Sequence, residues 1–593
     1  MGIYDYLILG FYFIFIFSIG LIFRRYSRDI SDYFRGGGSM LWWMSGASAL
    51  LGALSVWSFT GAAGEIYDAG TLILLVFWSS VIVGVFVWLV TCYKFRRMRV
   101  ITPVQAIQRR YGPATEQLYL WVQLPLGLFF GGVGLNTLAV FISSAFHTNF
   151  LATIVVVGVI VMFVSAAGGA WSVVAGDFVQ MLIMFSVVLV AAFLTLRQPA
   201  IGGITGLLHK LPPDRLHWTL LERPGVLTLW GVALVLQTFM IYNDLSQGAA
   251  KFMTVKNETH ARKAALLLLA VYIFLPIVLM IPPLAAVILF PHLKTQFPNL
   301  THPHEGAYVA VCMKVMPRGM LGLLVSAMFA TAMANMDTGL NRNAGNFVQN
   351  FYQQFLRPKA TQTELLAASR ITTVIFGMII IGIGLLIAQF RTMNLFNFVI
   401  IAFALVGPPI TVPMVLGLFI RRTPSWAGWS TIIVGFFISA LMYWGFNPDW
   451  IKGLLGVHHA YNKQERDNVV FAAQFIAEVG VASLWYWFTM RFAARSSPEY
   501  QRSADAFFAD MKRPIDPMAE GLVYDDTRQY RVLSRMCLVY GGVVLLGMLI
   551  PNNLTGRLCF GFIGGVIVTI GILLLIAERR SRRSVPASQS PDR

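Results

Sequence analysis

The stretch MFATAMANMDTGLNRNAGNF, residues 328–347, decides how this chain folds. It continues an apolar segment that begins near Met320, and it then introduces hydroxyl, amide and carboxylate side chains. Four polar side chains recur at intervals of four, three and four residues: Thr331, Asn335, Thr338 and Arg342. This spacing places them on one face of a helix. A strongly apolar helix with a polar face predicts a functional site inside a helix bundle.

Small residues and one acid form the adjacent strip of this helix: Ala330, Ala334, Asp337 and Asn341. Small residues allow another helix or an ion to approach closely. A carboxylate costs about 2.5–3.5 kcal/mol at the centre of a membrane helix, so Asp337 is expected to face the bundle interior and have a partner. The alternative is that Asp337 and Arg342 lie at the cytoplasmic end of the helix and pair with each other or with lipid headgroups.

The composition of the whole chain places this helix in a membrane. The 593 residues are 57% hydrophobic and 12% charged, with a mean hydropathy of +0.68. Soluble domains carry about 25% charged residues. About 15 apolar segments approach the length of about 20 residues that a membrane helix needs. These spans are 4–23, 41–64, 71–93, 118–147, 151–167, 176–196, 227–243, 264–290, 316–345, 366–388, 394–420, 426–446, 469–490, 533–550 and 557–577. The sequence predicts an all-α integral membrane protein.

The net charge of +18 follows the expected topology. With the N-terminus outside, most Lys and Arg fall in cytoplasmic segments, as the positive-inside rule requires. The basic surplus therefore indicates orientation in a plasma membrane, or in the inner membrane of a bacterium, and not a nucleic-acid partner. Asp5 precedes the first span and Arg24 and Arg25 follow it, which indicates a retained anchor with its N-terminus outside and the C-terminus cytoplasmic.

The four cysteines fit neither a zinc site nor a disulfide framework. No pair of histidines with metal-ligand spacing lies within a span, which argues against a membrane enzyme. The longest polar segment, 491–532, is expected to be an internal loop with one surface helix.

Two further stretches carry candidate functional residues. Asp177 opens the span 176–196, where it serves either as a functional acid or as a helix N-cap. Ser55, Trp57, Ser58 and Thr60 lie among small residues in the second span, which fits a helix that unwinds and exposes backbone carbonyls to a hard cation. Trp57 either stacks on a solute or fills the core. Proline and glycine also interrupt the fourth, eighth and eleventh spans. At each site they are either ordinary packing glycines and kinks or breaks, and together they suggest a transporter with broken helices around a central cavity.

These stretches resemble the sodium:solute symporters, the family of sodium–glucose, sodium–proline and sodium–sialic acid transporters. The resemblance covers about residues 4–450. The matching segments are SDYFRGGGSMLWWMSGAS, SFTGAAGEIYDAG, GGAWSVVAGDFVQ, KFMTVKNETHARKAALL, MPRGMLGLLVSAMFATAMANMDTGLNRNAGNFVQNFY and FNFVIIAFALVGPPITVPMVLGLFIRR.

The resemblance implies a five-plus-five inverted repeat of the leucine-transporter type. Repeat one would be 41–196 and repeat two 227–420, which together form a core at 41–420. An anchoring helix and an internal loop would occupy 1–40. Accessory helices, the loop 491–532 and a short cytoplasmic tail would occupy 421–593.

The family's main sodium site implies the backbone carbonyls of Leu51 and Leu54, with Thr331, Ala334 and Asn335. This chain departs from the family, because two adjacent hydroxyls are usual where it has Ala334 and Asn335. A possible second site for a cation or a proton comprises Asp177, Asp337 and Thr338. The solute would meet Ala53, Trp57, Ser58 and Asn243, and Asp244 lies beside Asn243 on the inner side of the path.

The family implies cation-coupled symport by alternating access, with sodium as the coupling ion and a sugar, organic acid or amino acid as the solute. Sugar-binding members carry Gln and Asn side chains where this chain has Ala53, Trp57 and Ser58. The alternatives are a proton-coupled or uncoupled transporter of the same fold and a solute-sensing homologue that does not transport.

Overall fold

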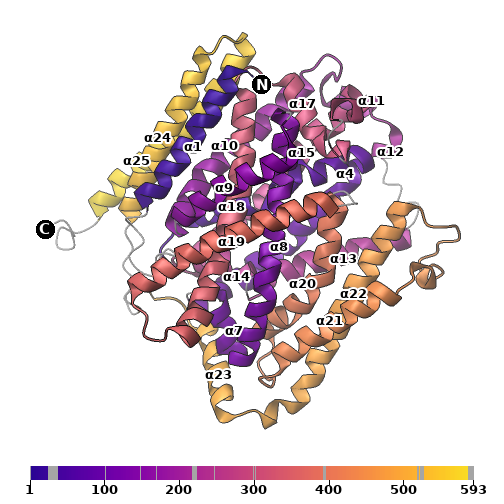
Figure 1. Cartoon of the computed structure of the whole chain (residues 1–593), viewed down its shortest axis with the longest axis vertical. Coiled ribbons are helices and arrows are strands. Elements are labelled where there is room, and N and C mark those ends of the chain that lie inside the picture. Colours follow the sequence, from indigo (N-terminus) through magenta and orange to yellow (C-terminus); the bar gives the residue numbers. More distant parts are fainter. Residues whose placement is uncertain are drawn as a thin grey trace.

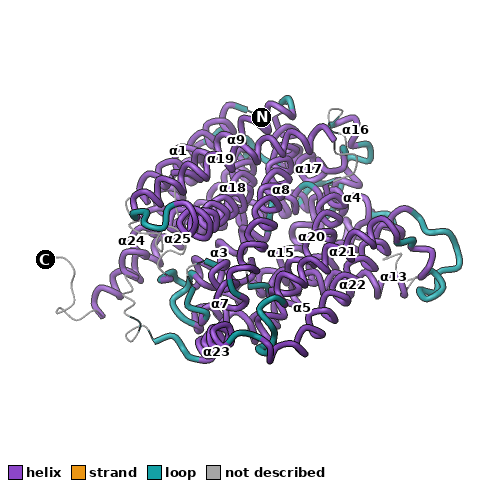
Figure 2. Tube along the Cα trace, turned by 60° about the horizontal axis from the view of Figure 1, so that its bottom comes forward, coloured by secondary structure: helices purple, strands orange, loops and turns teal. Residues whose placement is uncertain are grey.

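The structure is a computed structural model. It describes residues 2–23, 38–100, 102–146, 148–167, 170–216, 224–245, 247–297, 300, 302–390, 395–516, 520 and 526–584. The described part of the chain is 86% helical and contains no strand, so the expected all-α class is confirmed. The helices pack side by side into one bundle, with short connections at its two ends (Figures 1 and 2).

The first half of the bundle runs to the end of α15. Its elements are α1 (Ile3–Phe23), α3 (Trp42–Ala53), η2 (Val56–Phe59), α4 (Gly61–Ala69), η3 (Gly70–Ile73), α5 (Leu74–Phe86), the π turn η4 (Val87–Thr91), α6 (Cys92–Arg97), α7 (Pro103–Tyr111), α8 (Pro113–Phe146), α9 (Phe150–Ala167), α10 (Ala170–Leu196), α11 (Gly203–Lys210), α12 (Pro213–Leu216), α13 (Pro224–Asn243), α14 (Gln247–Met253) and α15 (Glu258–Leu289).

The second half begins with short elements and ends with long helices. Its elements are α16 (Leu293–Gln296), η6 (Pro303–Gly306), α17 (Ala307–Val315), α18 (Met320–Phe347), the π-helix η7 (Val348–Leu356), α19 (Gln362–Phe390), α20 (Leu395–Phe419), α21 (Ala427–Gly445), η8 (Pro448–Ile451), α22 (Lys463–Thr489), η9 (Met490–Arg495), α23 (Pro498–Lys512), α24 (Asp526–Leu546), η10 (Gly547–Leu549) and α25 (Leu554–Ser584).

Twelve helices of the described part are long and apolar enough to cross a membrane, and two shorter apolar helices lie at Ile3–Ile19 and Phe150–Phe163. Large apolar side chains are exposed along the outer helices, among them Ile14, Phe437, Leu484 and Phe562. In water such a surface would favour aggregation, whereas lipid solvates it. The chain is therefore a multi-pass membrane protein, and the count of about 15 spans remains a prediction.

The helix that carries the opening stretch, α18, lies at the centre of the bundle (Figure 1). It packs against α10, α8, α1, α19 and α3. Thr331, Ala330 and Ala334 are fully or almost fully buried. The sequence predicted this helix at 316–345, close to its observed bounds of Met320–Phe347. A helix surrounded on all sides can present its polar face only to other helices, as the opening pattern implied.

The second span is broken, as predicted. Helix α3 ends at Ala53, and Leu54 (φ −87°, ψ 53°) and Ser55 (φ −55°, ψ 163°) then leave the helical conformation before η2 begins. In the fourth, eighth and eleventh spans the structure agrees with the alternative of ordinary kinks and packing glycines. Helices α8, α15 and α20 continue through Pro125, Pro276 and Pro408. Proline removes only one helical hydrogen bond, and neighbouring helices allow membrane helices to tolerate that loss.

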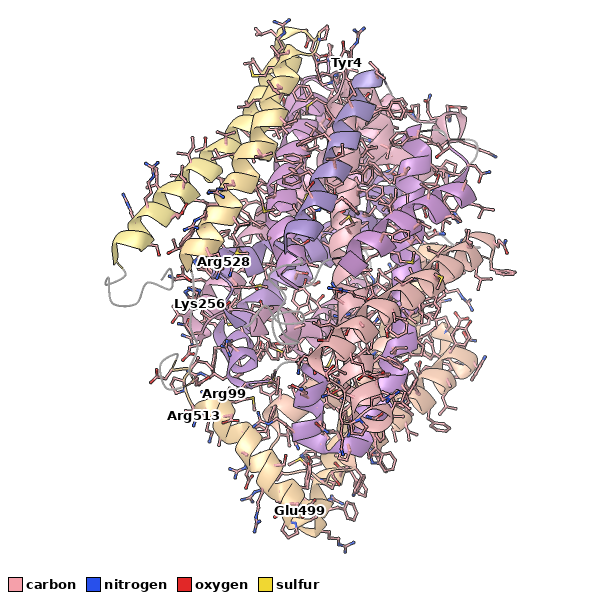
Figure 3. The ribbon with its side chains drawn as sticks, turned by 60° about the vertical axis from the view of Figure 1, so that its left-hand side comes forward. Tyr4, Arg99, Lys256, Glu499, Arg513 and Arg528 are labelled. Carbon is pink, nitrogen blue, oxygen red and sulfur yellow. The ribbon has the colours of Figure 1, made fainter. Side chains whose placement is uncertain are left out.

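The N-terminal helix and the loop 491–532 lie toward opposite ends of the bundle. Tyr4 lies at one end, and Arg99, Arg513 and Glu499 gather at the other (Figure 3). The N-terminal helix therefore starts at the end opposite the loop 491–532, which agrees with the relative topology predicted from the basic residues.

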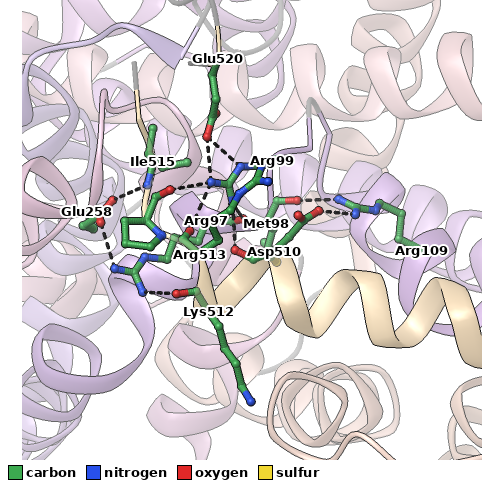
Figure 4. Close-up of polar contacts among 11 residues, drawn as sticks. Arg97, Met98, Arg99, Arg109, Glu258, Asp510, Lys512, Arg513, Ile515 and Glu520 are labelled. Carbon is green, nitrogen blue, oxygen red and sulfur yellow. Dashed lines mark hydrogen bonds and ion pairs between the residues drawn. The ribbon is translucent and has the colours of Figure 1, made fainter. Parts of the chain in front are cut away.

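The expected surface helix of that loop is α23, and it is bound to α6 and α7 by a set of polar contacts that we call the α23 clasp (Figure 4). The clasp comprises α23 and the side chains of Arg97, Arg99, Arg109, Arg110, Glu258, Asp510 and Glu520. One ion pair, Arg109–Asp510 at 2.6 Å, joins α7 directly to α23. Arg99–Glu520 at 2.8 Å holds the segment after α23, and Arg97–Glu258 at 2.9 Å joins α6 to the start of α15 beside it.

Arg110 is the buried anchor of the clasp. Its side chain has 0% exposure, and its guanidinium donates to the carbonyl oxygens of Gly417 (3.0 Å) and Ile420 (2.6 Å). It also donates to the hydroxyls of Thr423 and Tyr500. These four partners come from the end of α20, the segment after it, and α23. Arg110 therefore joins residues of the two predicted repeats at one end of the bundle.

Candidate functional site

The break in the second span creates backbone acceptors inside the bundle. The amide of Leu54 still donates to the carbonyl of Leu50 at 3.0 Å, but because α3 ends at Ala53, the carbonyls from Leu51 onward lose the helical donors four residues further along the chain. Leu51 and Leu54, the residues expected to supply these carbonyls, are both buried. The break faces the central helix, since α18 packs against both α3 and η2.

Thr331 brings a hydroxyl to this part of the bundle. It is fully buried, and its Oγ1 donates to the carbonyl of Met328 at 2.8 Å within α18. Ala334 is buried one turn further along. The side chains of Asn335, Asp337 and Thr338 lie outside the described residues. Their place in the site stays a prediction from the helical spacing.

Asp177 lies inside α10 and is almost fully buried, at 3% exposure. Because α10 begins at Ala170, the alternative that Asp177 caps the helix was wrong, and the predicted start of that span at 176 was too late. The hydroxyl of Ser48 donates a hydrogen bond to Asp177 Oδ2. This contact ties α10 to α3 about one turn before Leu51, so a carboxylate lies close to the break.

Ser48 is a residue that the sequence reasoning missed. It lies in the quoted segment that ends in SGAS, three residues before Leu51 and so on the same side of α3. The spacing of three residues between Ser48 and Leu51 is the sequence signal that could have identified Ser48 as part of the site. Its partner is 129 residues away in the chain, which no local pattern reveals.

The residues expected to meet the solute lie around the break. Ser58 is buried in η2, and the half-buried Trp57 packs against the main hydrophobic core. This packing agrees with the core-filling alternative for Trp57 and leaves part of the ring accessible. The side chain of Ala53 lies outside the described residues.

Asn243 joins two helices. It is fully buried at the end of α13, where its Oδ1 accepts from Thr91 Oγ1 at 2.7 Å and its Nδ2 donates to the carbonyl of Phe239 at 3.0 Å. Asp244 Oδ1 accepts from the backbone amide of Gly248 at the start of α14. These contacts hold the bend between α13 and α14 against the π turn η4. Asn243 therefore has a structural role in addition to the contact with a solute that the sequence predicted.

The geometry combines a broken helix, free backbone carbonyls, a hydroxyl and a buried carboxylate at the centre of a membrane bundle. Oxygen ligands of this kind suit a hard monovalent or divalent cation. Broken helices at mid-membrane are the usual binding elements of secondary transporters. The fold and the site together define a membrane transporter of the secondary active class.

The chain matches the family model of the sodium:solute symporter family over residues 33–435. It belongs to that family, as the sequence indicated.

Curated relatives agree with this assignment. The chain is 25% identical to the sodium/glucose cotransporter 2 of Rattus norvegicus over 459 residues, which cover 70% of this chain and 68% of the relative. It is 24% identical to the sodium/myo-inositol cotransporter 2 of Sus scrofa, with 73% and 68% covered. These relatives are transporters and not enzymes, and together with the family they support sodium-coupled symport.

Two solved structures share the fold. A Na⁺-coupled sialic acid symporter in a substrate-bound outward-open state superposes with a TM-score of 0.63 at 16% identity, covering 82% of this chain and 98% of that one. A nucleobase-cation-symport-1 family transporter superposes with a TM-score of 0.50 at 12% identity, covering 80% and 98%. The neighbours are transporters with a leucine-transporter-like fold.

Proposed function

We propose that this protein is a secondary active transporter that couples the entry of sodium to the uptake of a small polar organic solute by alternating access. One observation carries the proposal, namely that the break at Leu54 and Ser55 packs against the polar helix α18 at the centre of the bundle. A cation bound between the two would hold them together. Because coupling is reciprocal, the same cation raises the affinity for the solute.

The architecture that supports this mechanism is a five-plus-five inverted repeat. Repeat one covers 41–196 and repeat two covers 227–420. The segment 1–40 precedes this core, and the accessory helices in 421–593 follow it. The N-terminus lies outside and the C-terminus is cytoplasmic, so the α23 clasp lies on the cytoplasmic face.

The main sodium site is built from the carbonyls of Leu51 and Leu54 and the oxygens of Thr331 and Asn335. Ala334 supplies no side-chain oxygen, so the site has one hydroxyl fewer than is usual in the family. Asp177 supports a second cation site. Its contact with Ser48 places a carboxylate beside α3, and Asp337 and Thr338 extend that site along α18.

The solute binds beside the break, near Ala53, Trp57 and Ser58, with Asn243 on the inner side of its path. Sugars and polyols come first among the solutes to test, because the relatives are named for glucose and myo-inositol. Organic acids and amino acids are tested next. They are candidates because this chain has Ala53, Trp57 and Ser58 where the sugar-binding members of the family carry amide side chains.

Uptake into proteoliposomes tests the proposal. Purified protein is reconstituted, and labelled solutes are supplied with an inward gradient of sodium, potassium or protons in parallel. We expect accumulation above equilibrium only with the sodium gradient, and its loss in Thr331→Ala. Accumulation driven by protons alone would favour the proton-coupled alternative. Binding of the solute without accumulation under any gradient would favour a sensor.

A further inference from the structure

Glu116, in the first turns of α8, is a buried carboxylate that the site described above does not use. Its side chain has 0% exposure. Within the described part of the chain, neither carboxylate oxygen has a hydrogen-bond donor. An ionised carboxylate buried without a partner costs several kcal/mol. Glu116 must therefore be neutralised by a proton or by a bound cation.

Two contacts show how α8 lies against α18 and η7. Gln117 Nε2 donates to the carbonyl of Asn350 at 2.9 Å. Further along α8, a Cβ added to Gly127 would lie 2.4 Å from Asn343 Nδ2, so the two helices almost touch there. The helices are therefore antiparallel, and the turns from Glu116 onward lie opposite the polar end of α18 and the start of η7.

The seam between these elements is rich in oxygen atoms. A narrow pocket in it is lined by Tyr119, Leu120, Gln123, Leu124, Asn343 and Asn346. Glu116 shares a helix face with Leu120 and Gln123, one turn before this pocket. Across the seam, the buried Oδ1 of Asn346 and the buried Oε1 of Gln349 also lack a donor among the described residues.

These orphan acceptors favour a metal cation over a proton. A proton on Glu116 neutralises one group and leaves both amide oxygens without a partner. A sodium ion accepts several oxygen ligands at once, and carboxylate and amide oxygens are typical of hard cations. Arg342 is the cationic residue of this part of α18. It interacts electrostatically with Tyr119 and Asp244 and not with Glu116.

The seam is separate from the main site. Asn346 lies about 22 Å along the helix axis from Thr331, at 1.5 Å per residue. The π-helix η7 begins at Val348, beside the seam, and π turns are frequent at functional sites.

We propose that Glu116, Asn346 and Gln349 form a further station for sodium, the seam site, between Thr331 and the end of the bundle that carries the α23 clasp. The seam site rests on the proposed sodium coupling. An ion that leaves the main site along α18 would reach it next, so the carboxylate of Glu116 assists release of the ion to that side.

Equilibrium binding of radioactive sodium to the purified full chain tests the seam site. The variants are Glu116→Gln, Asn346→Ala and Thr331→Ala. The matched control is Glu364→Gln, which changes a carboxylate on α19 that accepts from Tyr352. We expect Glu116→Gln to remove one class of bound sodium and Asn346→Ala to weaken it about tenfold. Thr331→Ala should remove the class of sodium bound at the main site, and the control should match wild type.

Unchanged sodium binding in Glu116→Gln, with Thr331-dependent binding intact, would overturn the seam site and leave the proposed function standing. A wild-type protein that binds no sodium would refute the proposed coupling itself. If Glu116→Gln does not fold, sodium binding to Asn346→Ala tests the seam site, because this variant leaves the carboxylate of Glu116 in place. Unchanged sodium binding in Asn346→Ala would then overturn the seam site. A Glu116→Gln protein whose melting temperature differs from wild type only in its pH dependence would show that Glu116 holds a proton, which contradicts the seam site.

Discussion

At the centre of the bundle the carboxylate of Asp177 meets the hydroxyl of Ser48, whereas at the α23 clasp each carboxylate meets a guanidinium. The central groups are few: the break after α3, Thr331 on α18, and Asp177 with Ser48 beside it. The clasp repeats one kind of contact several times, and most of its partners reach solvent. We therefore expect function to depend on single residues at the centre, whereas the stability of the clasp is distributed over many residues.

Replacing the central carboxylate should have the largest effect. Asp177→Asn keeps the shape of the side chain but removes its negative charge. The Ser48 hydroxyl donates to this carboxylate, and the proposed cation would bind it. Hydrogen bonds to charged groups contribute about 1.5–3 kcal/mol, so sodium-driven uptake at low sodium should fall by about ten- to 150-fold.

Asp505→Asn is the matched control, because Asp505 is an exposed residue of α23. Initial uptake rates at several sodium concentrations measure both variants. A sodium dependence of Asp177→Asn equal to that of wild type would remove Asp177 from the site.

Removing the buried anchor of the clasp should come next. Arg110→Ala leaves the carbonyls of Gly417 and Ile420 without donors in a buried position. Each unsatisfied buried group costs about 1–3 kcal/mol, so the free energy of unfolding should fall by at least about 2 kcal/mol. Arg110→Lys should rescue little, because an ammonium lacks the planar fork of donors. Thermal unfolding in detergent measures both, and a wild-type melting temperature for Arg110→Ala would refute its role as anchor.

Removing a peripheral arginine of the clasp should cost less. Arg99 sits in the left-handed region (φ 54°) and donates to Glu520 and to the carbonyls of Asp510 and Pro514. Because the remaining ion pairs hold α23, Arg99→Ala should lower stability by about 1 kcal/mol. A double-mutant cycle with Glu520→Ala isolates the pair. Strict additivity of the two single variants would show that the ion pair contributes nothing.

Breaking the exposed ion pair between Arg421 and Asp505 should have the smallest effect on stability. The hydrogen bond from Arg421 lowers the pKa of Asp505 from its ordinary value. A lowered carboxyl pKa stabilises the fold above the ordinary value, and that contribution is lost as the pH falls through the lowered pKa. Both side chains are exposed, and solvent and salt screen such pairs. Arg421→Ala should therefore keep the wild-type melting temperature at neutral pH, and a clear drop would show that the pair contributes to the clasp.

The sequence predicted the parts of the fold that local patterns encode. Apolar length located the long helices, and glycine and serine predicted that the second span unwinds. Proline in α15 and α20 left kinks and breaks as alternatives, because its effect on a membrane helix depends on neighbouring helices that the sequence does not show. The cap proposed for Asp177 failed because α10 starts six residues before the predicted span.

Long-range contacts could not be predicted from one sequence. Ser48 reaches Asp177 across 129 residues, and Arg99 reaches Glu520 across 421. No local sequence pattern marks these residues as partners, and only the packing of the chain brings them together. The same reason hid Glu116, which resembles a normal acid in the first turn of a helix until its burial is known.

The melting temperature of the purified protein in sodium, potassium and choline chloride at equal ionic strength tests the central claim most directly. A ligand that binds only the folded state at about 100 times its Kd stabilises it by about 2.7 kcal/mol. The account predicts a rise in melting temperature that is specific to sodium and is lost in Thr331→Ala. Equal melting temperatures in the three salts, or a sodium response that Thr331→Ala retains in full, would contradict a sodium site between the broken helix and α18.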